Sequence, residues 1–286
     1  MTSSQITPHR AAKTQVSLPG AVLAALRAEP ADPIGAAVLL VPGYTGSKED
    51  FAPLIDPLTS AGLAVLAIDL PGQYESPGPQ EEQDYLPRSV GRTIAALVAQ
   101  LAANGDRVLL LGHSYGGLVC RGAVLGGAPV AGLTLLGSGP AALPDGERRA
   151  RIDAAEPIMR AQGIEVVQQL REAVDGIAEP PELAELLRTR FLKSTPSGLL
   201  GMATALRTEP DLVDELAAAL SARDIPCLVA FGEDDDAWPV SVQREMANRL
   251  GAEVAVVPDS AHSPNTENPG SLLDVLLTTW KGWLAG

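Results

Sequence analysis

The stretch from Val108 to Leu118, VLLLGHSYGGL, constrains the fold more than any other part of the chain. It begins with four apolar residues, 108–111, which is typical of a short strand buried on both faces. Residues 112–116 then fit the pattern G-x-S-x-G, and the residues after them are small and apolar apart from Arg121. The stretch therefore predicts a strand, a tight turn with Ser114 exposed at its tip, and a largely buried helix.

The two glycines that flank Ser114 fit this interpretation. A side chain at Gly112 or Gly116 would meet the neighbouring strand or helix. The N-terminus of the following helix would supply N–H groups and positive potential where an oxyanion forms beside Ser114. The turn is thus typical of a serine nucleophile.

Apolar runs recur along the chain and alternate with helical patterns. Short initial strands are predicted at 15–18 and 22–26, and buried strands at 36–41, 63–70, 130–136, 225–231 and 253–257. Helical patterns separate or follow the buried strands at 87–103, 240–250 and 271–284. This alternation predicts an α/β protein with a mostly parallel central sheet and helices on both faces.

The alternation stops between Pro140 and Asp211, where about seventy residues contain no strand pattern. This length exceeds an ordinary crossover between strands. The segment instead predicts consecutive helices at about 145–174, 181–193 and 197–207. We expect residues 1–140 to form the first part of a core, 141–210 a helical cap over the sheet, and 211–286 the second part of the core.

A serine hydroxyl needs a base that takes its proton, and the chain has three histidines. His9 lies in a polar N-terminal segment. His113 is adjacent to Ser114, and neighbours at such a turn point apart, so we expect it to be a structural imidazole behind the turn. His262 follows the last predicted strand, and the C-terminal ends of strands are where open α/β sheets collect their sites. His262 is therefore the candidate base.

The base needs a carboxylate that orients it. The loop after strand 225–231 offers Glu233, Asp234, Asp235 and Asp236, and the residues alone do not choose among them.

An oxyanion needs two backbone donors. One is expected from Tyr115, the residue after the nucleophile, and the other from the loop after the first central strand. In that loop Gly43 allows a close approach of the backbone, so the N–H of Tyr44 is the second candidate.

Five stretches together resemble the α/β-hydrolase family over essentially the whole chain: 42–47, 69–72, 112–116, 232–235 with Pro239, and 259–262. The resemblance implies the α/β-hydrolase fold and the order serine, acid, histidine. The family pattern G-x-x-D with a proline four residues later selects Asp235 as the acid. Tyr74 occupies a position where the family usually has glycine, so it is expected near the substrate.

The resemblance implies hydrolysis of a carboxylic ester or lactone of a small molecule through an acyl-enzyme, without a cofactor. Three scattered histidines give no metal-ligand spacing, so no metal is expected. Thioester hydrolysis, C–C bond hydrolysis, lyase chemistry and cofactor-free perhydrolysis could use the same residues. A non-catalytic protein that binds a small molecule could also retain the fold. Phe191 and Met202 are candidates for apolar substrate contacts from the cap.

Charge and hydropathy limit the partners. The net charge of −14 argues against nucleic acid and anionic membrane surfaces, which require a basic patch. No stretch has the roughly 18 consecutive apolar residues of a membrane span, and the N-terminus lacks the apolar segment of a signal peptide. A cytoplasmic protein is therefore expected. Cys120 and Cys227 lie in apolar stretches and are expected to be buried thiols rather than a disulfide.

Overall fold

A central sheet of eight strands organises the computed structural model, which describes residues 4–175 and 179–285. The strands are β1 (Ala12–Leu18), β2 (Ala21–Ala28), β3 (Ala36–Val41), β4 (Ala64–Ile68), β5 (Arg107–His113), β6 (Gly132–Leu136), β7 (Cys227–Gly232) and β8 (Glu253–Val257). Their order is β1-β2-β4-β3-β5-β6-β7-β8. β2 is antiparallel to both β1 and β4, and every other pair is parallel. The predicted mostly parallel sheet is confirmed.

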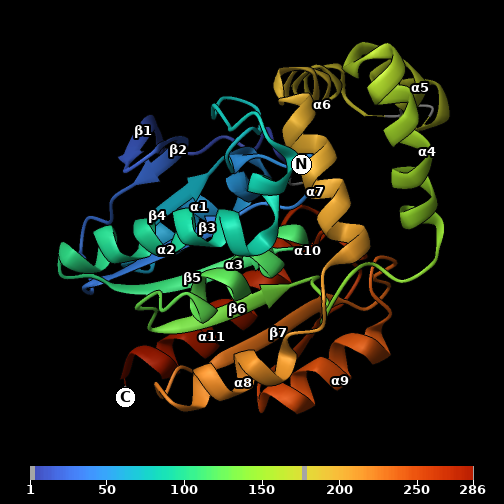
Figure 1. Cartoon of the computed structure of the whole chain (residues 1–286). Coiled ribbons are helices and arrows are strands. Elements are labelled where there is room, and N and C mark those ends of the chain that lie inside the picture. Colours follow the sequence, from blue (N-terminus) through green and yellow to red (C-terminus); the bar gives the residue numbers. More distant parts are fainter. Residues whose placement is uncertain (1–3, 176–178, 286) are drawn as a thin grey trace.

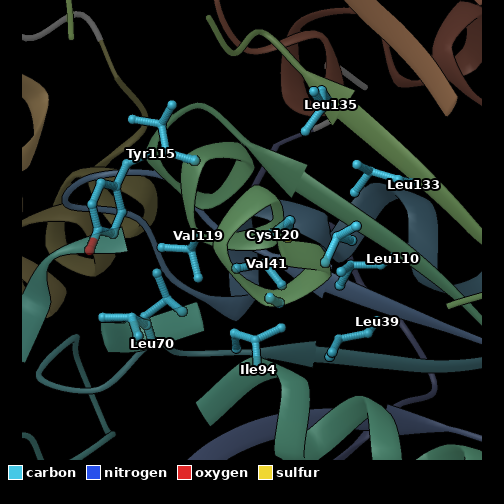
Figure 2. Packing of buried hydrophobic residues seen from close by; sticks show 14 of the residues in the cluster. Leu39, Val41, Leu70, Ile94, Leu110, Tyr115, Val119, Cys120, Leu133 and Leu135 are labelled. Carbon is cyan, nitrogen blue, oxygen red and sulfur yellow. The ribbon is translucent and has the colours of Figure 1, made fainter. Parts of the chain in front are cut away.

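Helices cover both faces of the sheet (Figure 1). One face carries α2 (Pro87–Ala103), α3 (Tyr115–Leu125), α8 (Val213–Ser221) and α9 (Val240–Leu250), and the other carries α1 (Ala52–Ser60) and α11 (Pro269–Ala285). Strand side chains alternate between the faces, so Leu39 packs with the first group and Leu40 with the second. Figure 2 shows the first cluster, in which Leu110 and Val41 lie beside Cys120 and Val119 of α3.

The segment between β6 and β7 contains α4 (Glu147–Gln162), α5 (Ile164–Asp175), α6 (Pro181–Lys193), α7 (Pro196–Thr208) and α8. The helices predicted at 181–193 and 197–207 are confirmed as α6 and α7. A single helix over 145–174 is wrong, because Gly163 has a φ of +87° and separates α4 from α5. Figure 1 shows α4 to α7 grouped on one side of the molecule. The short α10 (Pro264–Glu267) precedes α11.

The loop after β4 is less exposed than its polar composition suggests. Residues 73–85 are mostly polar, yet Gln73 and Tyr85 are fully buried. The Tyr85 hydroxyl donates to the Pro79 carbonyl at 2.7 Å, and residues Glu82–Tyr85 form a 3-10 turn. Buried polar groups need such partners; the loop itself supplies the one for Tyr85, and residues outside the loop supply those for the Gln73 amide.

Arg121 connects α3 to both ends of the helical segment. Its guanidinium is 3% exposed, donates to the Pro140 carbonyl at one end, and donates to the Glu209 carboxylate at 2.7 Å and the Pro210 carbonyl at 3.3 Å at the other. The helix that follows Ser114 is therefore tied to the two connections through which the segment leaves and rejoins the sheet.

We expect Arg121→Met to lower the free energy of unfolding by about 3–5 kcal/mol, because it leaves the buried Glu209 carboxylate without a counter-charge. Arg148→Met is the matched control, since Arg148 pairs with Asp236 at the surface and such pairs contribute about 0–1 kcal/mol. Urea unfolding measures both. Equal losses of unfolding free energy in the two variants would show that the buried pair contributes no more to stability than the exposed pair.

Among residues 4–175 and 179–285, no helix is long and apolar enough to cross a membrane. The same residues contain no group of three or more His, Cys, Asp or Glu side chains placed to hold a metal ion. Cys120 and Cys227 are buried, and both thiols are free.

Candidate active site

Ser114 occupies a strained turn between β5 and α3. Its φ of 55° and ψ of −123° form a backbone conformation that residues other than glycine rarely adopt. The Ser114 N–H donates to the Leu136 carbonyl at 2.8 Å, which fixes the turn to β6. A Cβ at Gly112 would overlap the Gly116 backbone, and one at Gly116 would overlap the backbone before Gly43. Both flanking glycines are thus required by close contacts, as predicted.

His262 and Asp235 form a hydrogen-bonded chain with Ser114. The Nε2 atom of His262 lies 2.9 Å from Ser114 Oγ, and its Nδ1 atom lies 3.0 Å from Asp235 Oδ1. Ser114, Asp235 and His262 follow β5, β7 and β8, whose C-terminal ends meet at one edge of the parallel sheet. The three residues are 8%, 7% and 6% exposed. The arrangement places a hydroxyl, a base and an orienting carboxylate within direct reach.

Two further donors hold the Asp235 carboxylate. The Ala237 N–H donates to Oδ1 at 2.9 Å, and Gln243 Nε2 donates to Oδ2 at 3.0 Å. Burial alone would raise the pKa of Asp235, but the hydrogen bonds and the neighbouring His262 outweigh it and lower this pKa below its usual value. The carboxylate is therefore ionised at neutral pH.

The other three acids of this loop do not contact His262. Asp234 and Glu233 are exposed, and the Glu233 carboxylate accepts from the Asp259 N–H at 2.7 Å. Asp236 pairs with Arg148 at 2.7 Å. Asp235, which only the family pattern had selected, is the acid that the structure places against His262.

Gln243 is a contact that the sequence reasoning missed. This α9 side chain is fully buried and also donates to the Trp238 carbonyl at 2.9 Å. The helical spacing of the sequence could have indicated its burial, because Gln243 shares a helix face with the apolar residues Met246, Ala247 and Leu250. All four residues are buried. A polar side chain on a buried helical face needs a partner, which here is Asp235.

His113 is a neutral imidazole behind the turn. Its Nε2 atom lies 2.8 Å from the backbone carbonyl of His262, so Nε2 must carry the proton and donate. The two imidazole rings are 5.0 Å apart. Burial, together with the nearby His262, lowers the pKa of His113 from 6.5 to about 4. The predicted structural role of His113 fits this geometry, in which it supports the backbone of the candidate base.

The low pKa of His113 makes stability depend on pH. An unfolded histidine titrates near 6.5, whereas His113 in the folded chain stays neutral down to about pH 4. Between these values the unfolded state binds more protons, so acidification lowers the free energy of unfolding by up to about 3 kcal/mol. A His113→Gln variant keeps an N–H for the His262 carbonyl and should lose less stability between pH 6.5 and 4. Urea unfolding at several pH values compares the two, and parallel pH profiles would contradict the prediction.

The backbone N–H groups of Tyr44 and Tyr115 are available beside Ser114. Tyr115 is the first residue of α3, and Tyr44 follows β3. Neither N–H has an acceptor among the residues that the structure describes. Gly43 lies so close to Ser114 that a Cβ added to it would come within 3.0 Å of the serine Cβ. Both N–H groups therefore belong to residues that are next to Ser114 in the chain or follow a residue packed against it.

A cavity of about 670 Å³ opens over Ser114 and His262. The helical segment contributes most of its apolar wall, which includes Leu143, Ile152, Ile158, Val167, Phe191 and Leu206. Phe191 thus lies where the sequence suggested, whereas Tyr74 and Met202 are absent from the cavity wall. The Tyr74 ring lies 4.5 Å from the Lys48 ammonium, and Met202 is fully buried in the core.

Four arginines that the sequence reasoning overlooked also line the cavity: Arg148, Arg151, Arg171 and Arg190. Arg190 of α6 pairs with Asp50 at 2.5 Å, and the Arg171 guanidinium lies 4.2 Å from the centre of the Phe191 ring. Long charged side chains on helices usually face solvent, so their sequence gives no signal of a cavity wall.

Comparisons with known proteins agree with this fold. Residues 38–275 match the model of the alpha/beta hydrolase family. The AB hydrolase superfamily protein YisY of Bacillus subtilis is 25% identical over 220 residues, which cover 74% of this chain and 79% of that protein.

Solved structures with the same fold cover nearly the whole chain. A thermophilic esterase from Thermogutta terrifontis is 24% identical, with a TM-score of 0.73 and coverage of 96% of this chain and 99% of that one. An esterase from Exiguobacterium antarcticum is 19% identical, with a TM-score of 0.76 and coverage of 94% and 100%. The enol-lactonase from Burkholderia xenovorans LB400 is 18% identical, with a TM-score of 0.73 and coverage of 96% and 100%. With the family model matched over most of its length, this chain belongs to the α/β-hydrolase family.

Proposed function

We propose that this protein is a serine hydrolase that cleaves a carboxylic ester or lactone of a small molecule through an acyl-enzyme. The observation that carries the proposal is the hydrogen-bonded chain of Ser114, His262 and Asp235 at the cavity. The likeness to two esterases and an enol-lactonase supports it.

In the first half of the reaction, His262 Nε2 takes the Ser114 proton while Oγ attacks the carbonyl carbon of the substrate. The carbonyl electron pair moves to oxygen and forms a tetrahedral oxyanion, which the N–H groups of Tyr44 and Tyr115 stabilise. The intermediate then collapses, the bond to the alkoxy oxygen breaks, and the leaving oxygen takes the proton from His262. The acyl group remains on Ser114.

In the second half, water replaces the leaving group and His262 takes its proton as it attacks the acyl carbon. The same N–H groups bind the second oxyanion, and collapse returns the proton to Ser114 Oγ and releases the acid. Asp235 remains ionised throughout, holds Nδ1 of His262 in the protonated tautomer, and stabilises the imidazolium that forms in each half.

Residues 141–210 act as a cap in this proposal, between the two core parts 1–140 and 211–286. Their helices line most of the cavity, so they keep bulk water from the acyl group and set which acyl groups fit. Phe191 is the aromatic side chain of this wall and remains our candidate for contact with the substrate.

The test is a panel of p-nitrophenyl esters of graded acyl length, lactones and acyl thioesters, measured with the wild type and Ser114→Ala. We expect cleavage of one or more oxygen esters or lactones that disappears in the variant. Turnover of thioesters far above their oxygen counterparts, or ester cleavage that survives in Ser114→Ala, would contradict the proposed reaction.

A further inference from the structure

The Gln73 side chain is fully buried directly beneath the loop that carries Tyr44. Its Oε1 atom accepts from the Leu70 N–H at 3.2 Å, and its Nε2 atom donates to the Gly43 carbonyl at 2.7 Å. Nε2 also lies 3.7 Å from the Met202 sulfur of α7. A backbone N–H can only donate and a carbonyl can only accept. These partners therefore require that Oε1 faces Leu70 and Nε2 faces Gly43.

The Gly43 carbonyl and the Tyr44 N–H belong to one peptide unit. In a planar trans peptide the two groups point in opposite directions, and the described residues contain no cis peptide bond. Gln73 Nε2 and the Gly46 N–H, at 3.1 Å, both hold the Gly43 carbonyl. The Tyr44 N–H is therefore directed away from Gln73, and it stays free of any acceptor in the described chain.

This peptide needs an external tether because Gly43 offers little resistance to rotation. A Cβ at Gly43 would crowd the Ser114 Cβ at 3.0 Å, and a residue without Cβ adopts many backbone conformations. A rotated peptide would turn its carbonyl oxygen toward the nucleophile, where it would repel a developing negative charge. Stabilisation of an oxyanion requires donors that are already oriented before the reaction.

We propose that Gln73 is a positioning residue that orients the Tyr44 N–H for the oxyanion by holding the Gly43 carbonyl. This inference rests on the proposed function. Met202 has a related role in this proposal, although it does not line the cavity. Its sulfur packs against the Gln73 amide and so connects α7 of the cap to the residue that holds the Gly43 carbonyl.

The experiment compares Gln73→Met with the wild type and with Ser194→Ala as a matched control. Ser194 Oγ accepts from the N–H of Tyr74, the residue after Gln73, at 3.3 Å. This hydrogen bond joins the loop that carries Gln73 to the cap without contacting Gly43. Steady-state kinetics on the best ester give kcat and KM. A trifluoromethyl ketone forms a tetrahedral oxyanion adduct with serine, so its affinity reports stabilisation of the oxyanion directly. The ether analogue of the ester has no carbonyl for Ser114 to attack, so its affinity reports substrate binding alone.

We expect Gln73→Met to lower kcat and the ketone affinity by a similar factor of about 10 to 100, somewhat less than the loss of an oxyanion donor itself. KM and ether affinity should stay within about twofold, and Ser194→Ala should resemble the wild type. Gln73→Glu keeps the acceptor for Leu70 but cannot donate to Gly43 once its carboxyl is ionised, so it should show the same losses at a pH above the pKa of this carboxyl, which burial raises. This second variant decides the matter if Gln73→Met does not fold.

Wild-type kcat and ketone affinity in a folded Gln73 variant would overturn the inference, as would equal weakening of ketone and ether. If these results accompany turnover that depends on Ser114, the proposed function stands and only the role of Gln73 falls. Ester turnover that survives in Ser114→Ala removes both.

Discussion

Ser114→Ala and His262→Ala should each lower kcat by about 10⁴- to 10⁶-fold, and the double variant should be little worse than either. Each residue contributes to catalysis only in the presence of the other. Ser114 Oγ is a weak nucleophile without His262, whose Nε2 lies 2.9 Å away, and without Ser114 the imidazole has no hydroxyl to deprotonate for attack on the substrate. The losses therefore do not add. Kinetics on the best ester, with circular dichroism to confirm folding, measure the effect.

The chain offers matched controls for both substitutions. Ser138→Ala removes a hydroxyl that is buried against α3 and has no hydrogen-bond partner among the described residues. His9→Ala removes a histidine of the N-terminal segment. Both controls should keep turnover within a few-fold of the wild type. Additive losses in the double variant would mean that Ser114 and His262 act independently, and near-normal turnover in either single variant would remove its assignment.

Asp235→Asn should lower kcat by about 10⁴-fold, while Asp234→Asn and Asp236→Asn should stay within a few-fold of the wild type. An asparagine amide can donate to Nδ1 of His262 and thereby stabilise the tautomer that cannot accept the Ser114 proton. Asp236 is the sharpest control, because it is adjacent in sequence, lines the same cavity and loses an ion pair with Arg148. Steady-state kinetics of the three variants decide among them.

A large loss in Asp236→Asn, with Asp235→Asn nearly active, would show that the orienting carboxylate lies one residue further along than the hydrogen bond to His262 indicates. Equal sensitivity of all three would point to the summed charge of the loop rather than to one placed carboxylate.

The sheet and the Ser114 site follow closely from local sequence. Strands of a buried parallel sheet must be apolar on both faces, so runs such as 36–41 are visible without any tertiary information. The ends of these strands meet at one edge, which brings together Ser114 and His262 although 148 residues separate them. Asp235 could be selected only through the resemblance, because charge and spacing alone do not separate it from Asp234.

The cavity wall could not be predicted in the same way. Phe191 and Met202 are both apolar residues on helices between β6 and β7, yet one faces the cavity and the other the core, since the rotation of each helix is set by distant packing. Tyr74 was expected near the substrate because glycine is usual at its position. Its φ is +42°, and its ring packs against the Lys48 ammonium outside the cavity.

Covalent catalysis by Ser114 is tested most directly by labelling the wild-type protein with a small fluorophosphonate and mapping the labelled peptide by mass spectrometry. We predict one phosphonyl group for each chain, attached to Ser114, with loss of ester hydrolysis in proportion to labelling and protection by substrate. A label on another residue, or full labelling of Ser114 with ester hydrolysis intact, would contradict the mechanism.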